Sequence, residues 1–195
     1  MRVDSVTGHV VGPNAILQTA EALRAEGGKT LARKVFGAAG LIDMLNKPPQ
    51  VMVEQGAAAA LHDAVARELP DAQAAIVAQS AGRRTGDYIL EHRIPRTAQT
   101  VLRLLPARFA GPALLRAIRQ HAWTFAGSGV VTIGTVPEMT LTIEANPLAT
   151  PGCPWHRAVL ETLFRDLVSP DIRVREDACC AHGATACRFV MARGG

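Results

Sequence analysis

The chain has 195 residues, of which 48% are hydrophobic and 19% charged, and its formal net charge at pH 7 is +4. This composition excludes an intrinsically disordered chain, and no apolar run reaches the roughly 18 to 20 residues that a membrane span needs. The N-terminus lacks the layout of a signal peptide, a positive segment followed by an apolar one, so we expect a soluble, cytoplasmic protein with no transmembrane segment.

The first part of the chain is predicted to be helical, because aromatic residues amount to only 4% and small aliphatic residues must fill most of the core. Helical segments are predicted over residues 13–25, 30–46 (in short pieces), 51–69, 71–92, 97–105 and 112–125. Pro13 suits a first helical turn and Gly27 suits a helix end, and Asp71 is a candidate N-cap. The glycines and arginines of residues 82–86 indicate either an anion contact or a break in the helical stretch.

The sequence pattern changes at residue 127. Beyond it, the pattern predicts strands over residues 130–136, 139–145, 171–178 and 187–192 and an amphipathic helix over residues 155–168. We therefore predict an α+β fold in which several helices pack on an antiparallel four-stranded sheet. In this interpretation residues 1–195 form a single domain, with a mainly helical part (1–126) and a β-β-α-β-β part (127–195).

The mild basic balance is a weak indication of any partner. The basic residues are nearly all arginines, spread along the chain and not clustered with aromatic residues. A nucleic-acid groove needs a basic stripe with stacking rings, so we expect no nucleic-acid partner.

All four cysteines lie in the last 43 residues, at positions 153, 179, 180 and 187. A disulfide scaffold would distribute its cysteines through a small secreted chain, so the clustering favours a metal site. Cys153 precedes the last predicted helix, Glu176 and Cys179 end the third predicted strand, and Cys187 opens the fourth. The glycine-containing loop between the last two strands can turn back tightly, which brings these residues to one corner.

Three thiolates and one carboxylate form a closed tetrahedral set of the kind that suits structural zinc. A competing ligand set would use His156, which forms a Cys-x-x-His pair with Cys153, or His182. The remaining alternative is that Cys179 and Cys187 are small buried hydrophobic residues, as free cysteines often are.

At these residues the chain resembles the 4-vinyl-reductase domain family. The resemblance is carried by the segment from Glu176 to Cys179, by a seven-residue loop with a glycine, and by the segment from Cys187 to Val190, with Cys153 at the expected distance upstream. The phenol-sensing members of this family hold a zinc by cysteine, glutamate, cysteine and cysteine at similar spacing. The resemblance thus implies a zinc site formed by Cys153, Glu176, Cys179 and Cys187.

The resemblance covers about residues 127–193 and implies a fold similar to the small trafficking-complex subunits, with several helices packed on an antiparallel sheet. It also implies a homodimer formed through the helical side, and the alanine-rich segment 51–69 offers small residues for such a contact. By size and texture the chain is most similar to the family's small bacteriochlorophyll-pathway members, which are labelled 4-vinyl reductases of protochlorophyllide.

A vinyl reductase needs a nicotinamide, flavin or iron–sulfur cofactor to supply its electrons. Gly127-x-Gly129 precedes a strand instead of opening a helix, unlike a dinucleotide fingerprint, and Leu23 stands where a phosphate loop ending at residues 28–30 needs its first glycine. The cysteines suit an iron–sulfur cluster by type, but the family spacing favours zinc. The enzyme assignment is left open, and the missing redox motifs favour a protein without turnover of its own.

We therefore expect a binding or carrier protein for a magnesium-tetrapyrrole intermediate of bacteriochlorophyll biosynthesis, with the pathway enzymes as candidate partners. The alternatives are the 4-vinyl reductase itself and a small-molecule sensor domain. Such a pigment needs an apolar cleft, an axial histidine and arginines for its propionates. Of the candidates His62, His92, His121 and His156, we select His121, together with Trp123, because both end the helical half where it meets the sheet.

Overall fold

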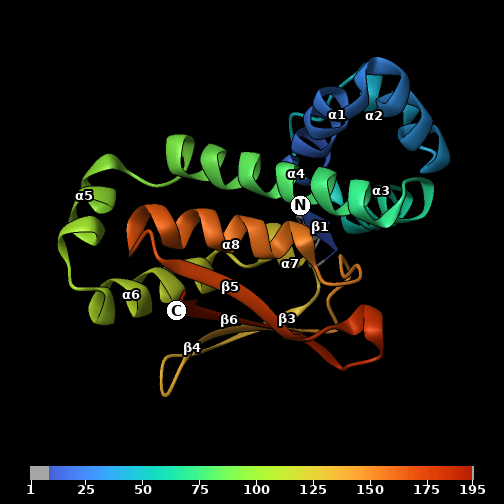
Figure 1. Cartoon of the computed structure of the whole chain (residues 1–195). Coiled ribbons are helices and arrows are strands. Elements are labelled where there is room, and N and C mark those ends of the chain that lie inside the picture. The colour runs from blue at the N-terminus through green and yellow to red at the C-terminus, as the bar shows by residue number, and fades with distance from the viewer. Residues whose placement is uncertain (1–8, 195) are drawn as a thin grey trace, which may run out of the picture.

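The computed structural model describes residues 9–194, which form a helical layer on one face of a four-stranded sheet (Figure 1). The helices are α1 (Asn14–Ala38), α2 (Ile42–Asn46), α3 (Gln55–Glu68), α4 (Asp71–His92), α5 (Arg96–Leu104), α6 (Ala107–Gln120), α7 (Trp123–Ala126) and α8 (Pro154–Leu167). The strands are β1 (Val10–Val11), β2 (Val53–Glu54), β3 (Val130–Gly134), β4 (Met139–Glu144), β5 (Ile172–Ala178) and β6 (Ala186–Arg193). The predicted α+β fold is confirmed.

The main sheet has the strand order β3-β4-β6-β5, and every neighbouring pair is antiparallel. Side chains alternate between its faces, so that Ile143, Cys187 and Phe189 are fully buried under the helices. The opposite face carries charged residues, among them Arg175, which pairs with Asp177. One face of the sheet therefore contributes to the core, and the other meets solvent.

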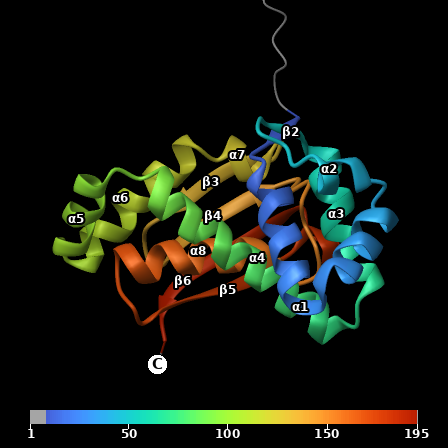
Figure 2. The ribbon, with the colours of Figure 1, turned by 90° about the horizontal axis from the view of Figure 1, so that it is seen from above.

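Helix α8 lies on the buried face of the sheet, and α4 lies on α8 (Figures 1 and 2). The contact between the two helices is close because α4 presents glycines. A Cβ on Gly82 would overlap the Trp155 carbonyl oxygen and lie 2.7 Å from the Ala158 Cβ, and a Cβ on Gly86 would lie 2.7 Å from that of Thr162. The segment 82–86 is thus a helix contact inside α4 and neither a break nor an anion site.

The helical half departs from the predicted elements in four places. Gly27 and Gly28 leave the helical conformation, but a second helical segment continues from them as part of α1. Pro70 and not Asp71 occupies the N-cap of α4, and Asp71 makes no capping hydrogen bond. Helix α6 starts five residues earlier than predicted and contains Pro112, which lacks one backbone donor. The short pair β1–β2 had no sequence pattern that would predict it.

Within residues 9–194, none of the helices combines the length and the apolar character that a bilayer crossing requires.

The close α4–α8 contact leads to a stability prediction. Replacing Gly82 with alanine should lower the free energy of unfolding by about 1–3 kcal/mol, because the added methyl group forces the two helices apart. The matched control is Gly56→Ala in α3, where a Cβ meets nothing within 4 Å and the substitution should stabilise by about 0.5–1 kcal/mol. Urea unfolding measures both, and equal effects of the two substitutions would contradict the packing argument.

Candidate metal centre

Four potential metal ligands meet at the corner where α8 begins and β5 turns into β6. They are Cys153, Glu176, Cys179 and Cys187, and one ligand atom from each lies within 4.8 Å of the others. The three cysteines are buried, and one carboxylate oxygen of Glu176 is buried without a hydrogen-bond partner. The structure therefore brings together the four residues that the sequence analysis selected.

The backbone at this corner is shaped to aim the ligands inward. Gly152 and Cys153 both have positive φ, 73° and 37°, which turns the chain so that Pro154 opens α8 in the first-turn position that suits proline. A left-handed conformation is unfavourable for a residue with a Cβ. The conformation of Cys153 is therefore held by the surroundings of its thiol.

A β-bulge places Glu176 and Cys179 on the same side of the sheet. Strand pairing shifts register between Glu176 and Ala178, and without such a shift, residues three apart would point to opposite faces. A short 3₁₀ turn over Cys180–His182 follows, and Gly183, at φ 87°, returns the chain to β6. The tight turn that the sequence predicted is confirmed.

The sulfur positions match the dimensions of a tetrahedral metal site. The Cys153 Sγ lies 3.5 Å from the Cys187 Sγ and 3.8 Å from the Cys179 Sγ. Metal–sulfur bonds of ~2.3 Å in tetrahedral geometry put neighbouring sulfurs about 3.8 Å apart, whereas a disulfide needs ~2.05 Å. All four cysteines are free, and the backbone N–H of Cys180 donates to the Cys187 Sγ at 3.3 Å.

The electrostatics of the cluster also indicate a cation. Burial raises the pKa of the Glu176 carboxyl and of the Cys179 thiol. The hydrogen bond to Cys187, and then burial, raise the pKa of Cys153, while that same hydrogen bond lowers the pKa of Cys187 to about 5. On its own the cluster thus has room for few negative charges, and a bound dication would favour the thiolate and carboxylate forms.

The competing ligand sets lie apart from this cluster. The Nε2 of His156 lies 3.3 Å from the carbonyl oxygen of Phe125 and its ring stacks near Phe189. His182 is exposed on the 3₁₀ turn. Neither histidine belongs to the group of converging ligand atoms. A purely hydrophobic role for Cys179 and Cys187 leaves the buried carboxylate of Glu176 unexplained.

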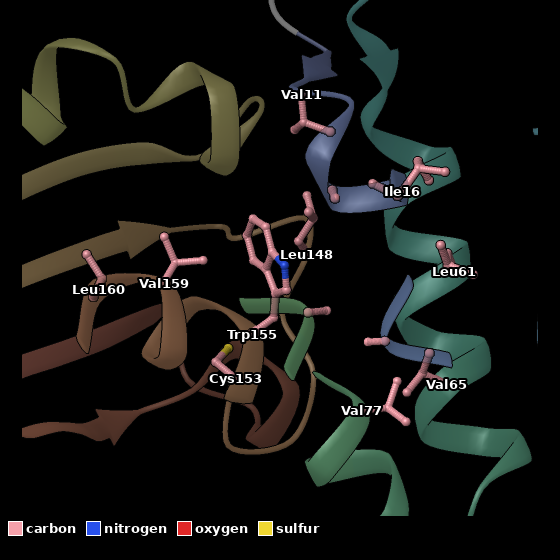
Figure 3. Close-up of a cluster of buried hydrophobic side chains, with 14 of the residues drawn as sticks. Val11, Ile16, Leu61, Val65, Val77, Leu148, Cys153, Trp155, Val159 and Leu160 are labelled. Carbon is pink, nitrogen blue, oxygen red and sulfur yellow. The ribbon is translucent and has the colours of Figure 1, made fainter. Parts of the chain in front are cut away.

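A second feature, a partly open cavity of about 290 Å³, lies beside the metal corner. Its lining comes from α1, α3, α4 and the start of α8: Thr19, His62, Val65, Ala66, Asp71, Ala74, Ala75, Ala78, Thr150, Pro151, Pro154 and Trp155. Figure 3 shows Trp155 among the surrounding core residues, with its indole nitrogen on the side facing α1 and α3.

His62 and Trp155 give this cavity a polar spot in an otherwise apolar wall. Their ring centroids are 5.3 Å apart, and both the Nε2 of His62 and the Nε1 of Trp155 are buried without hydrogen-bond partners among the described residues. Burial lowers the pKa of His62 to about 4, against the opposing effect of a hydrogen bond with the Ala15 carbonyl. His62 is therefore neutral near pH 7.

The residues selected from the sequence as pigment contacts lie elsewhere. His121 is exposed directly after α6, and Trp123 is 52% exposed in α7. Neither lines the cavity beside the metal corner. The sequence analysis gave no priority to His62, although a histidine within the apolar run of residues 57–65 was a signal that could have singled it out.

Comparisons with known proteins agree with the site and the fold. Residues 139–193, which contain all four candidate ligands, match the model of the 4-vinyl-reductase domain family. The chain is 41% identical over 189 residues to the bacteriochlorophyll synthase 23 kDa chain of Cereibacter sphaeroides, covering 94% of this chain and 90% of that protein. It is 37% identical over 186 residues to the protein of the same name from Rhodobacter capsulatus, covering 93% and 86%.

A solved structure with a similar fold is that of an H-NOX protein from S. oneidensis, determined in the Fe(II)NO ligation state. The TM-score is 0.55, with 95% of this chain and all of the other covered, and the sequence identity is 12%. At this identity the similarity concerns the fold alone.

The cluster predicts that metal binding and folding are coupled. Replacing Cys187 with serine should remove the bound metal and destabilise the protein by more than about 4 kcal/mol, because a lost metal site is one of the few causes of effects this large. Cys180→Ser is the control, since Cys180 lies in the same turn but outside the converging ligands. Elemental analysis and thermal unfolding with and without a chelator measure both, and metal-free, stably folded wild-type protein would refute the site.

His62 predicts a loss of stability in mild acid. Its pKa is about 4 in the folded protein and about 6.5 when unfolded, so the unfolded chain binds a proton first as pH falls. The stabilisation is complete above pH 6.5 and is lost between pH 6.5 and 4, by about 3 kcal/mol.

The glutamine variant of His62 should flatten this part of the stability profile relative to wild type, while His92→Gln, at a half-exposed site, should not. Urea unfolding from pH 4 to 8 gives the comparison, and parallel profiles for wild type and His62→Gln would show that His62 is not the titrating group.

Proposed function

The chain belongs to the family of the bacteriochlorophyll synthase 23 kDa chains, and we propose that it binds a magnesium-tetrapyrrole intermediate of bacteriochlorophyll biosynthesis and carries it to the pathway enzymes. The observation that carries this proposal is the 41% identity across nearly the full length of both chains. The names of both relatives support a role in bacteriochlorophyll biosynthesis.

We propose that the metal of the cluster is zinc and that its role is structural. The support is the chemistry of the donor set: three thiolates and one carboxylate complete a tetrahedron and leave no position open for a substrate or water. Thiolates favour zinc over hard cations such as magnesium and calcium. When bound, the zinc supplies the positive charge that holds these four side chains in their ionised forms.

For the pigment itself, the cavity offers a more specific contact than the surface residues His121 and Trp123. A neutral imidazole whose one nitrogen faces a backbone carbonyl and whose other nitrogen has no partner is the form that ligates a metal. His62 has this arrangement, and its Nε2 lacks a partner within the described part of the chain. We propose His62 as the axial ligand of the pigment magnesium, with the His121–Trp123 pair as the alternative contact.

The size of the cavity limits how a pigment is held. Ligand pockets that enclose a drug-sized molecule have volumes of about 300–1,000 Å³, and this cavity of about 290 Å³ lies just below that range. In the conformation described here it cannot enclose a whole macrocycle. Binding at His62 therefore requires α3 and α4 to separate from the segment 150–155, with the pigment edge left exposed, as a carrier that delivers its cargo needs.

The homodimer through the helical half remains a prediction. Helix α3, which the sequence analysis offered as the contact, already buries Ala58, Leu61 and Val65 within the chain. A dimer through α3 would have to use its outward-facing residues.

The carrier proposal is tested by mixing the pure, metal-loaded protein with divinyl protochlorophyllide, with and without NADPH. We expect a shifted pigment absorption band in both cases and no conversion of the vinyl group. Conversion by the pure protein would establish the reductase instead, and failure of every tetrapyrrole to bind would favour the sensor.

The position of the pigment is decided by two variants in the same titration. His62→Ala should weaken binding at least ten-fold, whereas His121→Ala should leave it unchanged, since an exposed side chain contributes little to burying a macrocycle. The reverse result would move the site to the α6–α7 junction and leave the carrier function intact.

A further inference from the structure

The charge of the chain is distributed unevenly in a way that its net value hides. Residues 92–137 contain six arginines and no aspartate or glutamate, whereas the remaining 149 residues carry 15 basic and 17 acidic side chains. The positive net charge of the protein thus arises entirely from this segment. It comprises α5, α6, α7 and β3.

The same segment exposes an unusual concentration of apolar side chains. Val101, Leu104, Leu105 and Phe109 surround the corner between α5 and α6, and their exposed fractions are 57%, 79%, 38% and 55%. Two views show α5 and α6 at the end of the molecule opposite α1–α3 (Figures 1 and 2). The apolar corner is therefore a projecting end of the protein and not a groove between elements.

The arginines of this end are mostly free of acidic partners. Arg103 pairs with Asp166 of α8, but Arg108, Arg116 and Arg119 are exposed and form no ion pair with any residue in the range 9–194. The Arg108 guanidinium lies 4.8 Å from the centre of the Phe109 ring. Positive charge and exposed apolar surface thus lie side by side, with nothing in this part of the chain to neutralise the charge.

We propose that the α5–α6 end docks on the surface of an anionic lipid bilayer. In the docked state the corner residues Leu104, Leu105 and Phe109 enter the interface between headgroups and acyl chains, and the α6 arginines contact lipid phosphates. Apolar burial combined with several basic residues is what holds an amphipathic helix in the plane of a membrane. The proposed contact is peripheral and involves no crossing of the bilayer.

An anionic bilayer fits this end better than an acidic protein does. A protein partner would supply a recess for a protruding Leu104 that is 79% exposed, and matched carboxylates for arginines on different helices. A bilayer accepts a convex apolar corner of any shape, and its phosphates adapt to the positions of the cations. The observations therefore favour lipid over a fixed macromolecular surface.

The test is co-sedimentation of the full-length protein with vesicles of phosphatidylcholine alone and of phosphatidylcholine mixed with phosphatidylglycerol. We expect binding only to the anionic vesicles, weakening as salt is raised. Arg116→Gln and Arg119→Gln should each lower the partition coefficient about five-fold, and the double variant Leu104→Ser, Phe109→Ser at least about ten-fold.

Matched controls lie at the other end of the molecule. Val51→Ser removes an apolar side chain that is 73% exposed, and Arg33→Gln removes an exposed cation of α1. Both should bind vesicles like wild type. All sites changed are exposed, so unchanged circular dichroism and thermal midpoints are expected for every variant.

Three results would overturn the proposal. The first is wild-type protein that stays in the supernatant with anionic vesicles. The second is equal loss of binding in the control variants, which would make the attraction nonspecific. The third is light scattering that shows a dimer dissolved by Leu104→Ser, Phe109→Ser, which would assign the corner to a second copy of the chain.

Discussion

The burial of four acidic donors at one corner is the constraint on which the rest of the structure depends. Cys153, Glu176, Cys179 and Cys187 come from three separate elements, and each brings a group that loses hydration when it is buried. Without a cation, burial disfavours the ionised forms, as the raised pKa of Glu176 shows. With a dication the same proximity becomes attractive, so the corner is a place where a metal and the fold stabilise each other.

Helix α8 transmits that constraint to the rest of the molecule. Its first turn follows the ligand Cys153 directly and carries Trp155 into the cavity wall and His156 into the core. Its remaining turns bury Leu163, Phe164 and other residues between the sheet and α4. A shift of the metal corner would therefore move the cavity wall and the α4 contact together, which links the occupancy of a structural metal site to the shape of the cavity.

The sequence was informative where the signal is local or where a motif has fixed spacing. β-Branched runs and helical periodicity identified the elements from β3 to β6, and the cysteine spacing selected the four ligands that the fold brings together. It was silent on the cavity, because His62 and Trp155 are 93 positions apart and meet only through the packing of α3 against the start of α8. The two-residue strands β1 and β2 are too short to show a period, and their pairing depends on tertiary contacts.

The charge distribution illustrates a third kind of information, which lies in the sequence but acquires meaning only from the fold. The arginines are spread along the chain, and their distribution alone indicated no partner; the telling feature is where acidic residues are missing. Exposure of Leu104 and Phe109 next to unpaired arginines turns that gap into a directed surface. Docking by the α5–α6 end would leave α1–α3, with the cavity they help to line, directed away from the bilayer (Figures 1 and 2). A carrier held in this orientation would face its partner enzymes with the cavity while staying close to the lipid phase into which an apolar pigment partitions.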